Sequence, residues 1–182
     1  MKLSQHLLTT AMIVLSAVLV ACNQQDKQQQ VQNNPVAFHS ADECHVCGMA
    51  ITRFPGPKGQ AINAQGKVKK FCSSAEMLNW WLQPENQVSA SAIYVHDMSQ
   101  GSWDKPDDSH LIEAQQAYYV VAPDMPGSMG TPIASFADQQ AAELFAADRK
   151  TTVMNFSQLK DALLQQQLSS SAQHADHQHM NH

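Results

Sequence analysis

The sequence predicts an α+β fold built from two β-β-α-β units, with mostly antiparallel sheets and helices packed on one side. Short apolar segments bounded by turn residues are typical of strands, and apolar residues at helical spacing follow them. The order strand, strand, helix, strand occurs twice, which favours antiparallel sheets covered by helices. A chain of 182 residues has room for one ordinary domain, or for two very small ones in contact.

The first unit is expected to contain two strands, a helix and a third strand. Gln65-Gly66 is a turn signal between two short apolar segments, so it predicts a hairpin. Ser73 and Glu76 have the spacing of a capping box, and the helix that they begin should end before Pro84. The three strands are expected over residues 61–63, 68–71 and 92–95.

The second unit repeats this order more loosely. Ser135 and Asp138 predict the start of a helix whose apolar residues share one face. Ser157 predicts the cap of a last helix. Strands are expected over residues 117–122, with an earlier partner around Leu111, and over 151–155. The inward residues of the two helices are expected to be Ala137, Ala141, Leu144, Phe145, Leu159, Ala162 and Leu163.

The N-terminus predicts export and attachment to a membrane. Residues 7–21 form an apolar run after a basic start, too short for a comfortable transmembrane helix. The run ends in Leu-Val-Ala-Cys, which resembles a bacterial lipoprotein cleavage box, so Cys22 is expected to be acylated after residues 1–21 are removed. An ordinary secretory signal with an incidental cysteine is the alternative. We expect a periplasmic protein held on a membrane by lipid, and Asn23 favours the outer membrane over the inner.

Composition divides the rest of the chain and excludes one class of partner. Residues 22–34 are rich in Gln and predict a flexible tether, residues 35–168 the folded domain, and residues 169–182 a His-rich flexible tail. The formal net charge is −5, and only 15% of the residues are charged. A nucleic-acid-binding protein should carry a basic patch, so we expect no nucleic-acid partner.

The most reactive side chains lie between Cys44 and Met49. Two thiols, the His45 imidazole and a thioether fall within six residues, and Gly48 permits a sharp bend between Cys47 and Met49. Soft sulfur ligands select monovalent copper over magnesium or calcium. The segment therefore predicts a site that carries copper(I).

Three other interpretations of the Cys44-x-x-Cys47 pair remain open. An exported protein meets an oxidising compartment, so the pair is compatible with a structural disulfide. A thioredoxin-like redox pair is a second alternative, although no long helix is expected after Cys47 to lower the pKa of a thiol. Zinc is the third, but no second Cys or His pair follows at finger spacing.

Several motifs, in order, resemble the NosL family of bacterial copper-binding lipoproteins. They are Cys47-Gly48-Met49, Phe54-Pro55-Gly56-Pro57-Lys58, Tyr94-Val95-His96-Asp97-Met98, and Ser128-Met129-Gly130-Thr131-Pro132 before Phe136. The resemblance covers residues 44–159 and implies a pair of β-β-α-β units. It also implies a metallochaperone without catalytic activity, which supplies copper for the copper centres of nitrous oxide reductase. The partner that the resemblance implies is nitrous oxide reductase or its assembly machinery.

The resemblance also implies metal ligands. Cys47 and Met49 match the Cys-x-Met pair of the family, and Met129 matches the Met of its Met-Gly motif. Further candidates are Cys44, His45 and Met98, and Cys44 is expected either to add a ligand or to pair with Cys47 when metal is absent. The alternative function is that of a periplasmic thiol–disulfide oxidoreductase that uses Cys44 and Cys47.

Other notable residues have plain structural interpretations. Cys72 follows an expected strand and precedes an expected helix, where a small buried residue is the commoner role. His96 is expected to be a structural histidine in a strand. Lys67, Lys69 and Lys70 form a basic cluster, interpreted as a solvated face or a docking surface.

Overall fold

The computed structural model describes residues 33–179 of the chain. The expected signal peptide, Cys22, nearly all of the tether over 22–34 and the last three residues lie outside the described residues. Among the described helices, none combines the length and the apolar composition needed to cross a membrane.

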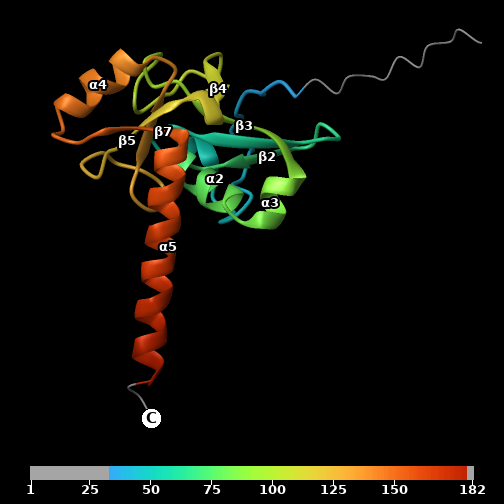
Figure 1. Cartoon of the computed structure of the whole chain (residues 1–182). Helices are drawn as coiled ribbons and strands as arrows, with labels where there is room; N and C mark the ends of the chain where they lie inside the picture. Colours follow the sequence, from blue (N-terminus) through green and yellow to red (C-terminus); the bar gives the residue numbers. More distant parts are fainter. Residues whose placement is uncertain (1–32, 180–182) are drawn as a thin grey trace, which may run out of the picture. The chain divides into compact units, whose positions relative to one another are not determined.

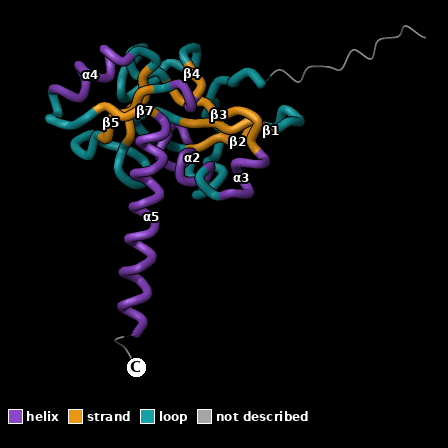
Figure 2. Tube along the Cα trace, in the orientation of Figure 1, coloured by secondary structure: helices purple, strands orange, loops and turns teal. Residues whose placement is uncertain are grey.

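Two antiparallel sheets organise the described residues, as Figures 1 and 2 show. Each of them contains one β-β-α-β unit, with the second strand, the first strand and the last strand of the unit side by side in that order. The α+β class and the antiparallel pairing expected from the sequence are therefore confirmed. The first sheet has the order β2-β1-β3-β4, with β1 Gly59–Asn63, β2 Val68–Phe71, β3 Ala90–His96 and β4 Leu111–Glu113. The second has the order β6-β5-β7, with β5 Tyr118–Val121, β6 Ile133–Phe136 and β7 Val153–Asn155.

Helices connect and cover these strands. Helix α2 begins after Ser73, whose hydroxyl accepts the Glu76 backbone N–H at 3.0 Å, as the capping motif predicts. Its apolar face packs on the first sheet, and α4 packs on the second (Figure 1). The helices are α2 Ser74–Trp81, α3 Pro84–Ser89, α4 Gln139–Ala147 and α5 Phe156–His179, with short 3-10 turns η1 Ile51–Arg53 and η2 Ala114–Gln116.

Two strand assignments differ from the expectation. The strand at Leu111 pairs with β3 of the first sheet, where Leu111 lies opposite His96, and not with the strand over 117–122. Ser135 does not begin a helix but lies buried in β6, where its hydroxyl donates to the His96 carbonyl at 2.6 Å. Asp138 is the actual cap of α4, since its carboxylate accepts the Ala141 N–H at 2.9 Å. The sequence does not identify β6 as a strand, because the apolar spacing around it also suits a helix.

The last helix also begins and ends differently. Asn155 and Gln158 cap it reciprocally, each side chain accepting the backbone N–H of the other at 2.9 Å, so Ser157 is not the cap. Leu159 and Leu163 are buried as expected, but Ala162 is exposed. Helix α5 continues to His179, so it includes most of the segment expected to be a flexible tail, which contains no Gly or Pro to end a helix.

The two units are joined beside the start of α2. The Ser74 hydroxyl donates to the Ile133 carbonyl of β6 at 2.6 Å, and the Met98 N–H donates to the Ser135 carbonyl at 2.8 Å. These bonds hold β6 against the end of β3 and the first turn of α2. The loop that leads into β6 is thereby brought next to Cys72.

Candidate metal centre

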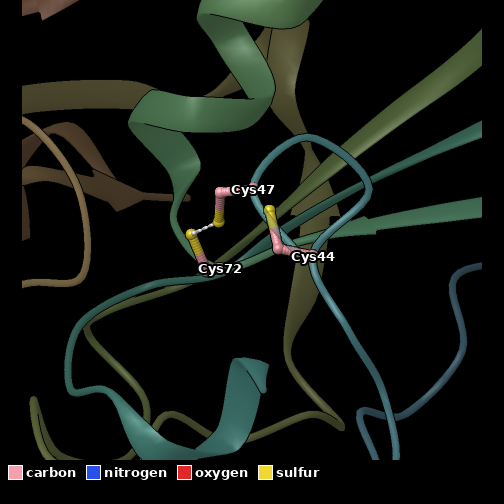
Figure 3. Close-up of side chains that lie close together, drawn as sticks. All are labelled: Cys44, Cys47 and Cys72. Atoms are coloured by element: carbon pink, nitrogen blue, oxygen red, sulfur yellow. Dashed lines mark hydrogen bonds between the residues drawn. The ribbon is translucent and has the colours of Figure 1, made fainter. Parts of the chain in front are cut away.

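Three cysteine side chains from two parts of the chain meet at one point, as Figure 3 shows. Cys44 and Cys47 come from the loop before η1, and Cys72 lies between β2 and α2. The three sulfur atoms lie within 4.8 Å of one another, and those of Cys47 and Cys72 are 3.7 Å apart. Within residues 33–179 no cysteine is in a disulfide, so all three thiols are free to bind a metal.

A tight turn places the first two sulfurs. The Cys44 N–H donates to the Met49 carbonyl, and the Gly48 N–H donates to the Cys44 carbonyl, both at 2.9 Å. Gly48 closes the turn at φ +72°, a conformation that side chains with a Cβ rarely adopt. The His45 N–H donates to the Lys70 carbonyl at 2.8 Å and fixes the turn to strand β2. The Cys-x-x-Cys-Gly pattern therefore builds a short, hydrogen-bonded loop with both thiols on its inner side.

The third sulfur is held by the junction of β2, α2 and the second unit. The Ser74 N–H donates to the Pro57 carbonyl at 2.9 Å, and the Ser128 hydroxyl donates to the Cys72 carbonyl at 3.1 Å. Cys72 is fully buried and Cys44 is only 3% exposed, whereas Cys47 is partly exposed. A metal ion would therefore reach the cluster from the side of Cys47.

The protein environment shifts the pKa values of the two buried thiols, Cys44 and Cys72, in opposite directions. Burial would raise the pKa of the Cys44 thiol, but the backbone N–H groups of Cys47, Cys72 and Val46 surround its sulfur and hold that pKa below the ordinary value. Burial raises the pKa of the Cys72 thiol to about 12. The surroundings of Cys44 therefore favour its thiolate more than those of Cys72, where the neutral thiol is favoured until a metal replaces its proton.

A buried lysine lies near the cluster. Lys58 is only 4% exposed, and its ammonium donates to the Phe54 and Pro55 carbonyls at 2.7 and 3.0 Å. Burial lowers the pKa of Lys58 to about 8, while its attraction to the Cys72 sulfur acts in the opposite direction. The charge of Lys58 therefore offsets part of the negative charge that thiolates bring into this region.

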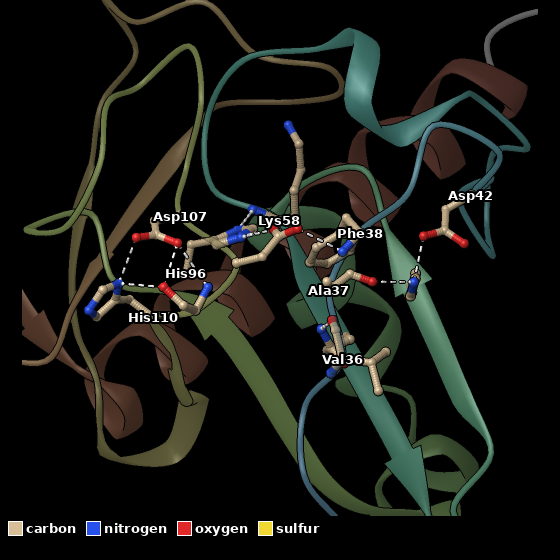
Figure 4. A network of polar contacts seen from close by, with 12 residues as sticks. Val36, Ala37, Phe38, Asp42, Lys58, His96, Asp107 and His110 are labelled. Carbon is tan, nitrogen blue, oxygen red and sulfur yellow. Dashed lines mark hydrogen bonds and ion pairs between the residues drawn. The ribbon is translucent and has the colours of Figure 1, made fainter.

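Polar contacts fix the chain segment that leads into residues 44–49, the metal loop, as Figure 4 shows. The Phe38 N–H donates to Asp108, whose other oxygen binds His96 Nε2 at 2.9 Å. His96 is 1% exposed, and its Nδ1 accepts the Lys58 N–H at 2.9 Å, so it is a satisfied structural histidine in β3, as predicted. Partial burial of Asp42 opposes its ionisation, but its pairing with Lys70 holds the pKa of Asp42 below the ordinary value.

The other predicted ligands, Met49, Met98, Met129 and His45, have different surroundings. Met49 is half-buried against the first apolar core, and Met98 packs against the second, with Val120 and Phe136. Met129 follows Ser128, is 44% exposed, and lines a cavity of about 290 Å³ between α2, α5 and the loop before β6. His45 is exposed, and its ring meets the Trp80 ring edge-on at 5.8 Å. Partial burial, then Lys69 and Lys67, lower the pKa of His45.

Sequence reasoning found Cys44 and Cys47 but missed Cys72 as a member of the cluster. Cys72 is separated from Cys47 by a hairpin, and nothing near it in the sequence resembles a ligand motif. The only available signal was its place at a strand end just before a capped helix, where several elements meet.

Comparison with known proteins identifies similar sequences and a similar structure. The sequence model of the NosL family matches residues 35–164. The "Copper-binding lipoprotein NosL" of Stutzerimonas stutzeri is 51% identical over 166 residues, covering 91% of this chain and 85% of the relative. The protein of the same name from Achromobacter cycloclastes is 30% identical over 152 residues, 81% of this chain and 77% of the relative. The crystal structure of the "copper chaperone NosL from Shewanella denitrificans" superimposes with a TM-score of 0.65 at 41% identity, over 69% of this chain and 94% of that one. The protein therefore belongs to the NosL family.

Proposed function

We propose that this protein is a periplasmic, lipid-anchored metallochaperone without catalytic activity of its own. It binds copper(I) at its cysteine cluster and delivers it for assembly of the copper centres of nitrous oxide reductase, to the enzyme or to its assembly machinery. The observation that carries the proposal is the convergence of Cys44, Cys47 and Cys72, whose sulfurs lie within 4.8 Å of one another. Two relatives are named copper-binding lipoproteins and a third a copper chaperone, which supports both the metal and the role.

The chemistry of the donors favours monovalent copper. Thiolates and thioethers are soft ligands, and the cluster offers no carboxylate that would favour a hard cation. Cys44 and Cys47 are proposed to bind as thiolates, which gives a copper(I) site one net negative charge. The third donor is proposed to be either Cys72, whose proton the metal replaces, or the neutral Met129 thioether, which adds no charge to a buried region.

Partial exposure of Cys47 suits a carrier. A metal enclosed by buried ligands on all sides would exchange slowly, whereas an acceptor can reach a ligand at the surface. Of the remaining predicted ligands, Met49 and His45 are proposed as secondary donors that act during loading or release, and Met98, which packs against the second core, as a packing residue.

Competition titration of copper(I) against a chromophoric chelator, under anaerobic reducing conditions, tests metal binding. The mature protein should bind one equivalent tightly, and Cys44→Ser/Cys47→Ser/Cys72→Ser should lose this binding. Ser109→Ala, at an exposed serine, is the control variant. Ser73→Ala would not serve, because it removes the cap of α2. Binding that is unchanged in the triple variant would refute the site.

Transfer to copper-free nitrous oxide reductase tests delivery. We expect the loaded protein to restore the copper centres and to show no turnover with dithiol substrates. Turnover of a dithiol substrate that requires Cys44 and Cys47, without copper binding, would instead support the thiol–disulfide oxidoreductase alternative.

Acylation of Cys22 is proposed as the means of membrane attachment, and two relatives carry the name lipoprotein. Cys22→Ser should yield a protein that is released from the membrane or left unprocessed. Mass spectrometry of the mature protein from its host checks this, and an unmodified Cys22 would contradict it.

A further inference from the structure

The turn that carries Cys44 and Cys47 displays two side chains outward. Val46, at its tip, is 52% exposed, and the neighbouring His45 is also exposed. The exposed Val46 side chain lies between the buried Cys44 and the partly exposed Cys47 in the sequence. Together these residues form the surface closest in sequence to the partly exposed Cys47.

The surface continues from the turn across α2 to the edge strand β2. The His45 ring meets Trp80 of α2 edge-on at 5.8 Å and Phe71 at 5.9 Å. On the same Trp80, the Lys69 ammonium lies 4.6 Å from the ring centre. Lys67 and Lys69 also line a small cavity of about 70 Å³ together with Trp80. A continuous patch of His45, Val46, Trp80, Lys67 and Lys69 therefore borders the metal loop.

This patch is positively charged on an acidic protein. The chain carries a formal charge of −5, yet neither Lys67 nor Lys69 has an ion-pair partner among the described carboxylates. The adjacent Lys70 is different, because it is paired with Asp42. Two unpaired ammonium groups beside an aromatic ring and an exposed Val are suited to an acidic protein surface with an apolar centre.

We propose that this patch is the docking face through which the protein meets an acidic surface around the copper-accepting site of its partner. The inference rests on the proposed copper delivery and adds the surface and the charge of the recipient. Contact at Val46 and His45 would place the partner's ligands beside Cys47, the partly exposed thiol. The two lysines would steer and orient the encounter without binding the metal.

The test compares copper(I) transfer from the loaded, full mature chain to two acceptors, copper-free nitrous oxide reductase and neocuproine, a small uncharged chelator. Lys67→Glu/Lys69→Glu should slow transfer to the enzyme about tenfold at low ionic strength. The same variant should release copper to neocuproine at the wild-type rate, because the metal ligands are intact. Added salt should slow wild-type transfer to the enzyme and leave the variant nearly unaffected.

Two control variants are compared with the charge reversal Lys67→Glu/Lys69→Glu. Lys105→Glu/Lys150→Glu changes the charge equally at two exposed lysines outside the patch and should transfer like wild type. Lys67→Arg/Lys69→Arg keeps the charge and should also transfer like wild type. Equal slowing by both reversals, or no slowing by either, would overturn the docking face.

Two further results would also overturn the docking face. In the first, the wild-type chain binds phosphatidylglycerol vesicles and Lys67→Glu/Lys69→Glu does not, while both transfer copper to the enzyme at the same rate. This result would assign the patch to the membrane. The second is a wild-type chain that binds copper but delivers none to the enzyme, which would overturn the proposed delivery as well.

Discussion

Cys47 differs from its two partners by being both partly exposed and 3.7 Å from a second sulfur. We therefore expect Cys47→Ser to weaken copper(I) binding most, by about 100-fold or more, which corresponds to about 2.8 kcal/mol. Cys44→Ser should weaken it less, because Cys47 can still bind with Cys72 or a thioether. Competition titration of the two variants measures the order, and equal losses would instead indicate a site in which both thiolates are equivalent.

Met129 is a predicted thioether ligand whose neighbour Ser128 donates its hydroxyl to the Cys72 carbonyl. Met129→Ala should weaken copper(I) binding about tenfold without abolishing it, since one neutral donor of several is lost. Met98→Leu is the matched comparison, because Met98 packs in the second core, and it should bind like wild type. If Met129→Ala binds copper(I) with unchanged affinity, Met129 is not a ligand and its loop only connects β5 and β6.

At the scale of single residues, local patterns in the sequence identified only part of the site. Cys44, Cys47 and Gly48 lie within one turn, so their spacing alone predicts that two sulfurs can converge. Cys72 joins them only because β2 runs beside the metal loop, and this depends on pairing between distant segments. Cys72 is buried, as an ordinary core cysteine would be, so its burial alone does not indicate that it belongs to the metal site.

At the scale of elements, the metal loop depends on the left-handed conformation of Gly48. A Cβ at Gly48 would meet no atom within 4 Å, so Gly48→Ala is strained only by its φ of +72°. We expect a loss of about 1–2 kcal/mol in unfolding free energy, together with weaker copper binding. Gly66→Ala, at φ +76° in the β1–β2 turn, should lose similar stability but keep its copper affinity. Loss of copper affinity in both variants would mean that stability, and not the loop, controls binding.

The contact between β3 and the N-terminal segment depends on a neutral His96. Burial lowers the pKa of His96, although the hydrogen bond to Asp108 acts in the opposite direction. At acidic pH the histidine therefore binds a proton more readily in the unfolded chain than in the folded one. The free energy of unfolding should therefore fall as the pH drops below about 6.5, the ordinary histidine value. Urea unfolding at several pH values measures this slope, and His96→Gln should flatten it. A variant with the wild-type slope would show that other groups cause the acid sensitivity.

Strands and helices were predicted best where the local signals agree with one another. The capping motif at Ser73 gave the start of α2, and the hairpin turn gave β1 and β2 nearly to the residue. Strand β6 was missed because its residues suit a helix face as well as a strand, and only pairing with β5 decides between them. The strand around Leu111, β4, was expected, but as the partner of β5, and it pairs instead with β3 of the first sheet.

At the scale of the whole molecule, the cysteine cluster lies where both β-β-α-β units meet. Cys72 lies in the first unit, its carbonyl accepts the Ser128 hydroxyl of the second unit, and its sulfur is 3.7 Å from that of Cys47 in the metal loop. The sequence predicts two such units. Their relative placement depends on hydrogen bonds between distant residues, such as that from the Ser74 hydroxyl to the Ile133 carbonyl, which local sequence patterns do not predict. A metal at this point would join segments that are distant in the chain, and any ligand that binds only the folded state also stabilises it.

X-ray absorption spectroscopy of the copper(I)-loaded protein tests the cysteine site most directly. We expect a copper coordination shell made of sulfur atoms, with fewer sulfurs in Cys47→Ser and in Cys72→Ser. The Met98→Leu protein should give the wild-type spectrum. A shell of nitrogen or oxygen donors that is unaffected by the cysteine substitutions would contradict the claim that Cys44, Cys47 and Cys72 form the copper site.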